Sequence, residues 1–126
     1  MNLTTVAVLG DIHTEDALLE QALAFVRPRV DTIFAVGDIV DGFGDVNRCC
    51  DLLRTNDVQV VRGNHERWLL DEEMRILNDA NQRADLRSDL IAWLNELPTT
   101  ITFETQDGPL LLCHGPVSYT HLTLPT

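Results

Sequence analysis

Four short motifs carry side chains that can bind metal ions and transfer protons. Each combines carboxylate, amide or imidazole groups, and they are Asp11-Ile12-His13, Gly37-Asp38 with Asp41-Gly42, Gly63-Asn64-His65-Glu66, and His114-Gly115. A mixed set of oxygen and imidazole ligands suits Mn, Fe, Zn or similar ions and does not suit a site that selects soft, thiolate-binding metals. Because the motifs lie tens of residues apart, only the fold can bring them into one site.

Each motif follows a segment that has the pattern of a β-strand. Three short apolar runs are typical of strands buried on both faces of a sheet, and they lie at Val6–Leu9, Thr32–Val36 and Val58–Val61. Two further strands are predicted at Thr100–Glu104 and Leu110–Cys113, joined as a hairpin around Asp107 and Gly108. His114 comes directly after the last of these strands.

Helical patterns separate the strands. Thr14 is a candidate N-cap for a helix that ends near Arg27, and Val46–Thr55 predicts a second helix. The acidic, mixed segment Arg67–Gln82 predicts a helix of uncertain extent over a loop region. Apolar residues recur at helical spacing from Leu86 to Leu97 and predict another helix.

This alternation predicts an α/β fold with a parallel sheet, because neighbouring parallel strands need a long crossover rather than a tight turn. The carboxyl ends of such strands share one edge, so the motifs should meet there. Asp11 and His13 are two residues apart, and on extended backbone both side chains would point the same way and hold one ion. The two oxygens of Asp38 could bridge two cations, with Asn64 and His114 as ligands of the second.

Composition limits the classes of protein that are possible. The 126 residues are 44% hydrophobic and leave room for one core and one domain. A net charge of −11 repels phosphate backbones, so we expect no stable nucleic-acid binding. All nine basic residues are arginine, which excludes lysine Schiff-base and P-loop chemistry.

No apolar run approaches the roughly 20 residues that span a bilayer, so we expect a cytoplasmic protein without a membrane partner. The oligomeric state stays open.

The cysteines and tryptophans predict structure rather than chemistry. Cys49, Cys50 and Cys113 form an odd set without CxxC spacing, which disfavours both disulfides and thiolate zinc sites. We therefore expect buried thiols. Trp68 and Trp93 are assigned to the hydrophobic core.

The last ten residues differ from the rest of the chain. Val117–Thr126 carries no charge, although the preceding 116 residues hold all 29 charged side chains. The segment is similar to the translation of a transposon end and adaptor used to prepare shotgun sequencing libraries. We interpret residues 117–126 as a non-native tail and residues 1–116 as the N-terminal part of a domain, with a native polar tail as the alternative.

Taken in order, the spacings D-x-H, GD-x-x-D-G, GNH-E and H-G resemble those of the calcineurin-like metallophosphoesterase family. The resemblance covers essentially all of residues 1–116. It implies a β-sandwich flanked by helices, incomplete here at the C-terminus, and a phosphoester substrate. The implied activity is hydrolysis of phosphate mono- or diesters by hydroxide generated at a dinuclear metal centre.

The resemblance also implies residue roles. Two divalent ions, with manganese favoured over Fe, Zn or Ni, would have Asp38 as their bridging ligand and Asp11, His13, Asn64 and His114 as the others. His65 would contact the phosphate and serve as the catalytic acid. Asp41, Gly37 and Gly63 would support the site.

The chain departs from the family pattern at one point. The family has a later G-H-x-H motif that supplies one histidine to each metal, and this sequence contains no such motif. His121 does not replace it, because it lies in the presumed tail and lacks the pattern. We therefore expect the 126-residue chain to bind metal weakly and to hydrolyse little or nothing.

Several functions stay open beside the favoured phosphodiesterase-like activity. A protein serine/threonine phosphatase would fit Arg62-Gly63-Asn64-His65-Glu66, but those enzymes place arginine after the second aspartate, where this sequence has Gly42. A dinucleoside polyphosphate hydrolase is another alternative within the enzyme class. A non-catalytic metal-binding scaffold of the same fold is an alternative of another class. A signalling receiver domain would need a lysine, which the chain lacks.

Overall fold

Three parallel strands form the sheet from which the candidate site emerges. In the computed structural model, which describes residues 5–115, they pair in the order β1 (Val6–Leu9), β2 (Thr32–Ala35) and β3 (Gln59–Val60). Val6 lies opposite Thr32, and Phe34 lies opposite Gln59. The three predicted strands and their parallel arrangement are therefore confirmed, with ends that differ by at most one residue.

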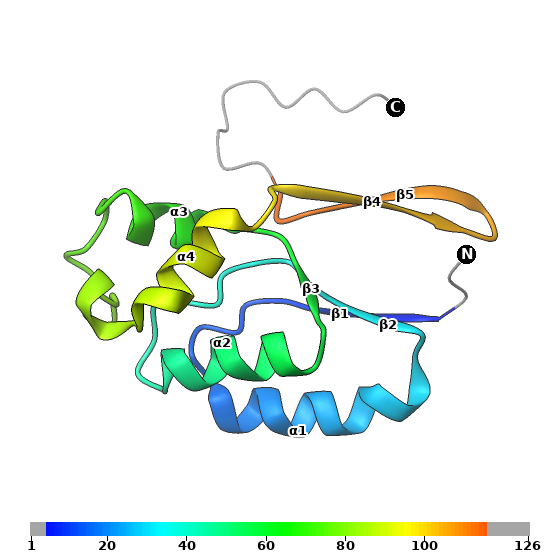
Figure 1. Cartoon of the computed structure of the whole chain (residues 1–126), viewed down its shortest axis with the longest axis horizontal. Coiled ribbons are helices and arrows are strands. Elements are labelled where there is room, and N and C mark those ends of the chain that lie inside the picture. Colours follow the sequence, from blue (N-terminus) through cyan, green and yellow to red (C-terminus); the bar gives the residue numbers. More distant parts are fainter. Residues whose placement is uncertain (1–4, 116–126) are drawn as a thin grey trace.

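Two helices cover one face of this sheet. α1 (Asp16–Val26), followed by the 3₁₀ turn η1 (Arg27–Arg29), and α2 (Val46–Thr55) lie side by side below the strands in Figure 1. α2 begins where the sequence predicts, because the Asp45 carboxylate accepts a hydrogen bond from the Arg48 N–H (3.0 Å) and caps the first turn. Within residues 5–115, no helix is long and apolar enough to cross a membrane.

Thr14 is not the N-cap of α1, contrary to the prediction. α1 starts two residues later, at Asp16, and no side-chain cap is formed there. Thr14 is buried with a positive φ of 60°, and its Oγ1 accepts a hydrogen bond from the Gly44 N–H (2.8 Å). The Thr14 hydroxyl thus bonds to a residue 30 positions away in the sequence and does not cap the helix as the local pattern predicted.

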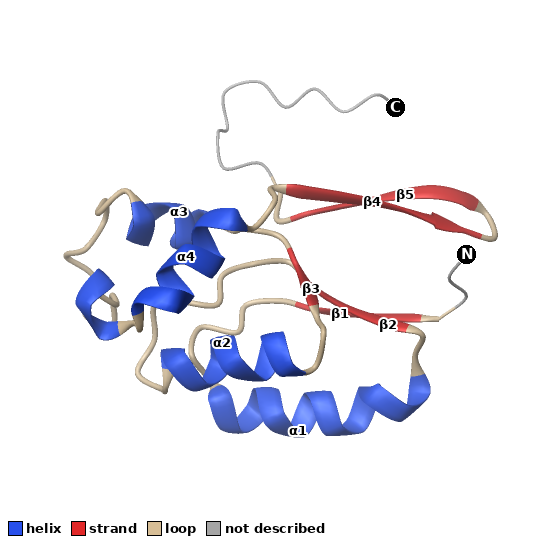
Figure 2. Cartoon of the chain, in the orientation of Figure 1, coloured by secondary structure: helices blue, strands red, loops and turns tan. Residues whose placement is uncertain are grey.

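A hairpin covers the other face of the sheet. β4 (Thr100–Thr105) and β5 (Gly108–Cys113) pair antiparallel, and Figure 2 shows them across the strands from α1 and α2. The Phe103 ring stacks on Phe34 of β2 with centroids 4.4 Å apart, and Leu112 is buried beside it. The predicted hairpin is confirmed, and the arrangement is helices, parallel sheet and hairpin in layers.

Only part of the segment predicted as a helix over residues 67–82 is helical. α3 spans Asn64–Leu70, residues 71–82 form turns, and a 3₁₀ turn η2 (Arg83–Asp85) precedes α4 (Ser88–Glu96). Glu72 and Met74 have φ values of 57° and 52°, which an α-helix does not accommodate. The Arg75 side chain instead bonds to carbonyls of this segment, as described below.

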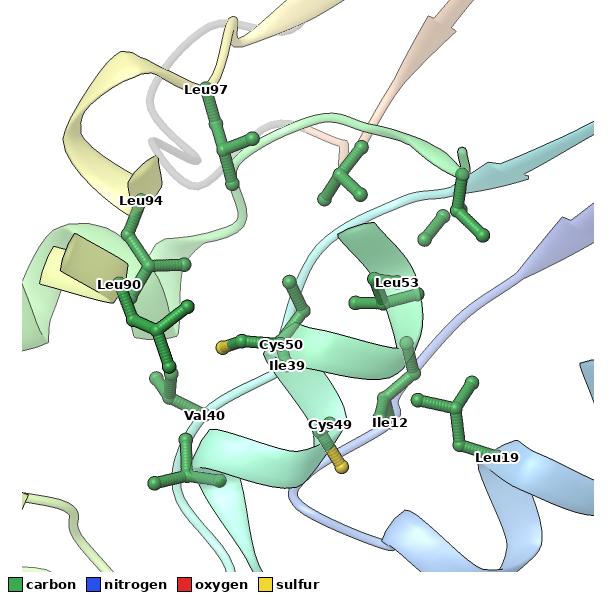
Figure 3. Packing of buried hydrophobic residues seen from close by; sticks show 14 of the residues in the cluster. Ile12, Leu19, Ile39, Val40, Cys49, Cys50, Leu53, Leu90, Leu94 and Leu97 are labelled. Carbon is green, nitrogen blue, oxygen red and sulfur yellow. The ribbon is translucent and has the colours of Figure 1, made fainter. Parts of the chain in front are cut away.

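The main core lies between the helices and the parallel sheet. Figure 3 shows residues of α2 and α4 meeting those of the loops after β1 and β2, among them Cys50, Leu53, Leu90 and Ile39. Burial raises the pKa of the Cys49 and Cys50 thiols to about 12, so both are inert apolar groups. Cys113, which was expected to be buried, is exposed on β5 because its side chain lies on the outer face of the hairpin.

β1 is less buried than its sequence predicts. Among the described residues it is an outer strand of the sheet, and Val8 is 50% exposed. The side chains of Val8, Leu9 and Leu18 line a cleft of about 360 Å³ between β1 and α1, which Asp11 and Glu15 border. A strand at the edge of a sheet has no neighbouring strand on one side. The apolar run at β1 therefore does not mean that the strand is fully buried.

Truncation of the core should destabilise the chain strongly. Leu53 of α2 is fully buried, so Leu53→Ala should lower the free energy of unfolding by about 2–5 kcal/mol, as removal of a buried leucine side chain does. Leu18 of α1 is 60% exposed and is the matched control, with an expected change within about 0.5 kcal/mol for Leu18→Ala. Urea unfolding measures both, and equal losses for the two variants would contradict this core.

Candidate metal centre

The loops after β1 and β2 are tied together by their backbones. The His13 N–H donates to the Asp38 carbonyl and the Thr14 N–H to the Ile39 carbonyl, each at 2.8 Å. Asp11, His13, Asp38 and Asp41 all have positive φ, between 40° and 73°. Strained conformations of this kind persist where surrounding contacts fix them and are common at functional sites. The two loops therefore form one rigid edge.

Two glycines let a third loop approach this edge. Gly37 has a φ of 91°, and a Cβ at this position would lie 2.5 Å from the Gly63 nitrogen. A Cβ on Gly63 would lie 2.5 Å from Asp38 Oδ1. Any side chain at either position would push α3 away from Asp38. The short separation also allows the His65 N–H to donate to Asp38 Oδ1 (3.2 Å).

Asp38 is the acidic centre of the cluster. It is 6% exposed, and its Oδ2 lies 3.2 Å from His114 Nε2 and 3.9 Å from His13 Nε2. The three side chains come from the loops after β1, β2 and β5, as the topology predicts for a site at a shared strand edge. A ring nitrogen of His65 completes a group with His13 and Asp38 whose ligand atoms lie within 4.8 Å of one another.

Backbone carbonyls orient both histidines that face Asp38. His13 Nδ1 lies 3.0 Å from the carbonyl oxygens of Val40 and Asp41, and His114 Nδ1 lies 2.6 Å from the Val36 carbonyl oxygen. Since a carbonyl can only accept, each Nδ1 carries the proton and donates it. Each Nε2 then presents a lone pair when the ring is neutral, which is the arrangement that metal-binding histidines use.

A second buried aspartate holds His65. Asp41 Oδ2 lies 2.8 Å from His65 Nδ1, and Arg75 donates to both Asp41 oxygens. Burial alone raises the pKa of Asp41, but the hydrogen bonds from Arg75, His65 and the Asn81 N–H outweigh burial and hold the pKa below its ordinary value. Asp41 is therefore an anion that accepts a hydrogen bond from the imidazole N–H of His65.

Glu66 fixes the loop after β2 to the start of α3. Its carboxylate is fully buried and accepts four backbone N–H bonds: Gly63 and Asp38 donate to Oε1, and Ile39 and Val40 donate to Oε2, at 2.7–3.1 Å. Burial raises the pKa of Glu66, and the backbone donors oppose that rise. The carboxylate satisfies peptide groups that would otherwise be buried without a partner.

The structure brings some of the predicted site residues together and leaves Asp11 apart from them. His13, Asp38, His65 and His114 come together, and Asn64 is the first residue of α3, directly before His65. Asp11 lies outside the group of His13, Asp38 and His65, and its side chain is exposed at the cleft beside α1. The expected extended backbone at Asp11 and His13 was wrong, since both have positive φ. β1 ends at Leu9, before the motif begins.

Three contributors were given no role at the site by the sequence analysis, although Glu66 is part of one of its motifs. Glu66 is the third residue of its helix, a position from which a glutamate commonly bonds back to the N-cap N–H, and that spacing could have identified it. Arg75 carries no comparable signal, because it lies in irregular chain. Trp68 was assigned to the core, yet it is half-buried and its ring contacts His65 edge-on at 4.9 Å between centroids.

The histidine–carboxylate cluster at the strand edge of this α/β fold is a candidate metal site, and the comparisons with known proteins identify the family. The sequence model of the calcineurin-like phosphoesterase family matches residues 4–125, so the chain belongs to this family. The family uses divalent metals and acts on phosphoesters. The resemblance read from the four motifs is thereby confirmed.

Two curated relatives match the chain over about half of its length. Serine/threonine-protein phosphatase 1 of Salmonella typhimurium is 41% identical over 66 residues, which are 51% of this chain and 31% of the relative. An uncharacterized protein of Methanocaldococcus jannaschii is 35% identical over 69 residues, 54% of this chain and 28% of the relative. The matched part therefore spans about a third of each relative.

Solved structures share the fold. A metallophosphoesterase from Sphaerobacter thermophilus, at 24% identity and a TM-score of 0.58, is covered over 43% of its length by 79% of this chain. A candidate diadenosine tetraphosphatase, at 33% identity and a TM-score of 0.64, is covered over 44% by 76% of this chain. The predicted calcineurin-like α/β fold is therefore confirmed, and the chain spans less than half of each of these structures.

The Glu66 carboxylate should stabilise the packing of the loop after β2 against the start of α3. Glu66→Gln would turn an NH₂ donor toward backbone N–H groups and should lower the free energy of unfolding by about 1–3 kcal/mol. Glu72→Gln, at an exposed position, is the matched control and should change stability by less than about 0.5 kcal/mol. Urea unfolding tests the pair, and an unaffected Glu66→Gln would contradict the four-bond arrangement.

The contribution of Asp41 to stability should depend on pH. Because folding lowers its pKa below the ordinary 3.8, the ionised carboxylate stabilises the folded chain fully above that value and loses this effect as pH falls through the lower folded pKa. Asp41→Asn should therefore be destabilising at about pH 6, and its deficit should shrink toward about pH 2. Urea midpoints at a series of pH values measure this, and a constant deficit would contradict it.

Proposed function

We propose that this site, in a chain that also carries the missing histidine ligands, hydrolyses phosphate mono- or diesters with the help of two divalent ions, and that phosphodiesters are favoured. The observation that carries the proposal is the position of two histidine Nε2 atoms, of His13 and His114, opposite one buried carboxylate oxygen of Asp38. In the neutral rings both Nε2 atoms are acceptors, and so is the carboxylate oxygen. Acceptors brought together in this way repel one another unless a metal ion or a ring proton lies between them.

The donor set fits a divalent transition metal. Imidazole nitrogen with carboxylate oxygen suits Mn, Fe, Zn or Ni, and manganese is favoured. The ligands would be His13 and Asp11 for one ion, Asn64 and His114 for the other, and Asp38 for both. Asp11 is the member whose carboxylate would have to turn from the cleft beside α1 toward the group.

When bound, the ions supply positive charge that stabilises phosphoryl oxygens and lowers the pKa of water. The protein's own contribution is to hold the ligands rigidly and to move a proton at His65. Because Asp41 accepts from His65 Nδ1, the ring exchanges its other proton at Nε2, where it can be given to the leaving oxygen. Trp68 packs against the His65 ring and limits its rotation.

Two other substrate classes are supported by particular relatives. The 41% identity with serine/threonine-protein phosphatase 1 favours phosphoprotein as the second candidate. The TM-score of 0.64 with a candidate diadenosine tetraphosphatase favours dinucleoside polyphosphates as a third. A metal-binding scaffold of the same fold would bind ions without turnover.

Metal binding by the chain should require Asp38. Calorimetric titration with Mn²⁺ should show weak binding, and Asp38→Asn should weaken it further by about 10-fold or more, because the shared carboxylate is lost. Asp107→Asn in the hairpin turn is the control and should leave the titration unchanged. Equal Mn²⁺ binding by the Asp38 and Asp107 variants would overturn the assignment of the site, and tight binding of two ions by the wild-type chain would contradict the expected loss of ligands.

Relative hydrolysis rates should identify the substrate class. With Mn²⁺ present, we expect slow hydrolysis of bis-p-nitrophenyl phosphate, slower hydrolysis of p-nitrophenyl phosphate, and the least with a phosphopeptide or diadenosine tetraphosphate. His65→Ala should lower turnover by about 10²-fold or more while Mn²⁺ binding is largely kept. A preference for the phosphopeptide would support the protein phosphatase instead. Tight Mn²⁺ binding with no turnover of any substrate would support the scaffold, because the low activity expected here is attributed to weak metal binding.

A further inference from the structure

The irregular segment of residues 71–82 is attached to the candidate site by one arginine. Arg75 Nη1 donates to Asp41 Oδ1 at 2.8 Å and Arg75 Nη2 donates to Asp41 Oδ2 at 2.9 Å, which is a two-pronged guanidinium–carboxylate pair. The same guanidinium donates to the carbonyls of Glu73 and Asn81, both at 2.7 Å. Its side chain is only 11% exposed. Arg75 is therefore fixed by its own segment on one side and fixes Asp41 on the other.

Asn81 closes the segment over Asp41. The Asn81 N–H donates to Asp41 Oδ1 (2.9 Å), and the Asn81 Oδ1 accepts from the Asp41 N–H (2.7 Å). Glu72 and Met74, on either side of Glu73, are held at positive φ. Such conformations cost free energy, and they persist here because the Arg75 and Asn81 bonds determine the path of the chain.

These contacts determine which atom of His65 carries a proton. Asp41 Oδ1 accepts from Arg75 and Asn81, and Oδ2 accepts from Arg75, so the carboxylate acts only as an acceptor. The 2.8 Å contact between Oδ2 and His65 Nδ1 must then be an N–H donated by the ring. The position of Oδ2 relative to His65 is set by the plane of the carboxylate, which the two prongs of Arg75 define.

We propose that Arg75 is a positioning residue that holds the Asp41 carboxylate in plane, keeps the proton of the neutral His65 ring on Nδ1, and leaves Nε2 free for the reacting groups. The role of Nε2 rests on the proposed function, whereas the location of the proton does not. A lysine cannot replace Arg75 fully, because an ammonium group makes point contacts and cannot bond to both carboxylate oxygens in one plane.

The test reads the ring of His65 directly. In the ¹⁵N-labelled metal-free chain, at a pH where the imidazoles are neutral, NMR distinguishes protonated from unprotonated ring nitrogens, and His65→Asn assigns the signals. The wild type should show Nδ1 protonated and Nε2 unprotonated. Arg75→Met should mix the two tautomers of His65, and Arg75→Lys should give a smaller change in the same direction.

Arg67→Met is the matched control, because Arg67 is exposed on α3 only two residues from His65. It should leave the His65 signals as in the wild type. Circular dichroism and urea unfolding show whether Arg75→Met stays folded. If it does not, the His65 nitrogen shifts of the Arg75→Lys variant are compared with those of the wild type. A His65 ring with unchanged nitrogen shifts in the folded Arg75 variants would overturn the proposal.

An activity measurement separates this inference from the proposed function. If bis-p-nitrophenyl phosphate is hydrolysed with Mn²⁺, Arg75→Met should lower kcat by about 10-fold or more with little change in KM, since Arg75 acts through His65 rather than on substrate. A loss confined to KM would overturn the positioning role. A wild-type chain that shows the Arg75-dependent tautomer supports the positioning role whether or not it hydrolyses the substrate. A chain that binds Mn²⁺ tightly and hydrolyses nothing contradicts the proposed function alone.

Discussion

The Glu66 carboxylate is the interaction on which the geometry of the site depends. It accepts backbone N–H groups from both the loop after β2 and Gly63, the residue directly before α3, and these two segments are far apart in the sequence. Loops seldom have buried acceptors for consecutive N–H groups, and without Glu66 these groups would lose their hydrogen bonds on burial. Asp38 lies on this loop and His65 follows Gly63, so the positions of both follow from the same carboxylate.

Three buried acidic groups meet at one edge of the sheet, and each is balanced differently. Glu66 is satisfied by backbone dipoles, and Asp41 by the guanidinium of Arg75 with help from His65. Asp38 accepts one N–H from His65 and otherwise faces imidazole nitrogens. Buried anions are costly unless they are compensated, so the third carboxylate is the one that a cation would stabilise most. This difference separates the two supporting carboxylates from the one that we propose as a metal ligand.

Membership of the calcineurin-like phosphoesterase family accounts for the layered fold. The chain spans 43% and 44% of the two solved structures described above, and its outer strand β1 is partly open. Residues 117–126, which are predicted to be a non-native tail, lie outside the described residues. The absence of a G-H-x-H motif is seen in the sequence and does not depend on the structure. The geometry of His13, Asp38 and His114 supports the proposal of a metal centre, and the substrate and the choice of manganese are separate proposals.

The sequence by itself determined the order of strands and helices, the hairpin, and which motifs stand at strand ends, because apolar periodicity and turn residues are local signals. It also placed Asp38, His65 and His114 at one edge, since parallel topology brings strand ends together. Only the tertiary structure decided which group bonds to the Thr14 hydroxyl, that Asp11 is exposed, and that Arg75 pairs with Asp41. These depend on positive-φ loops and on hydrogen bonds between segments about 30 residues apart, as with Thr14 and Gly44. Local patterns carry no information about such contacts, because the partner of each polar group is chosen only when the loops pack.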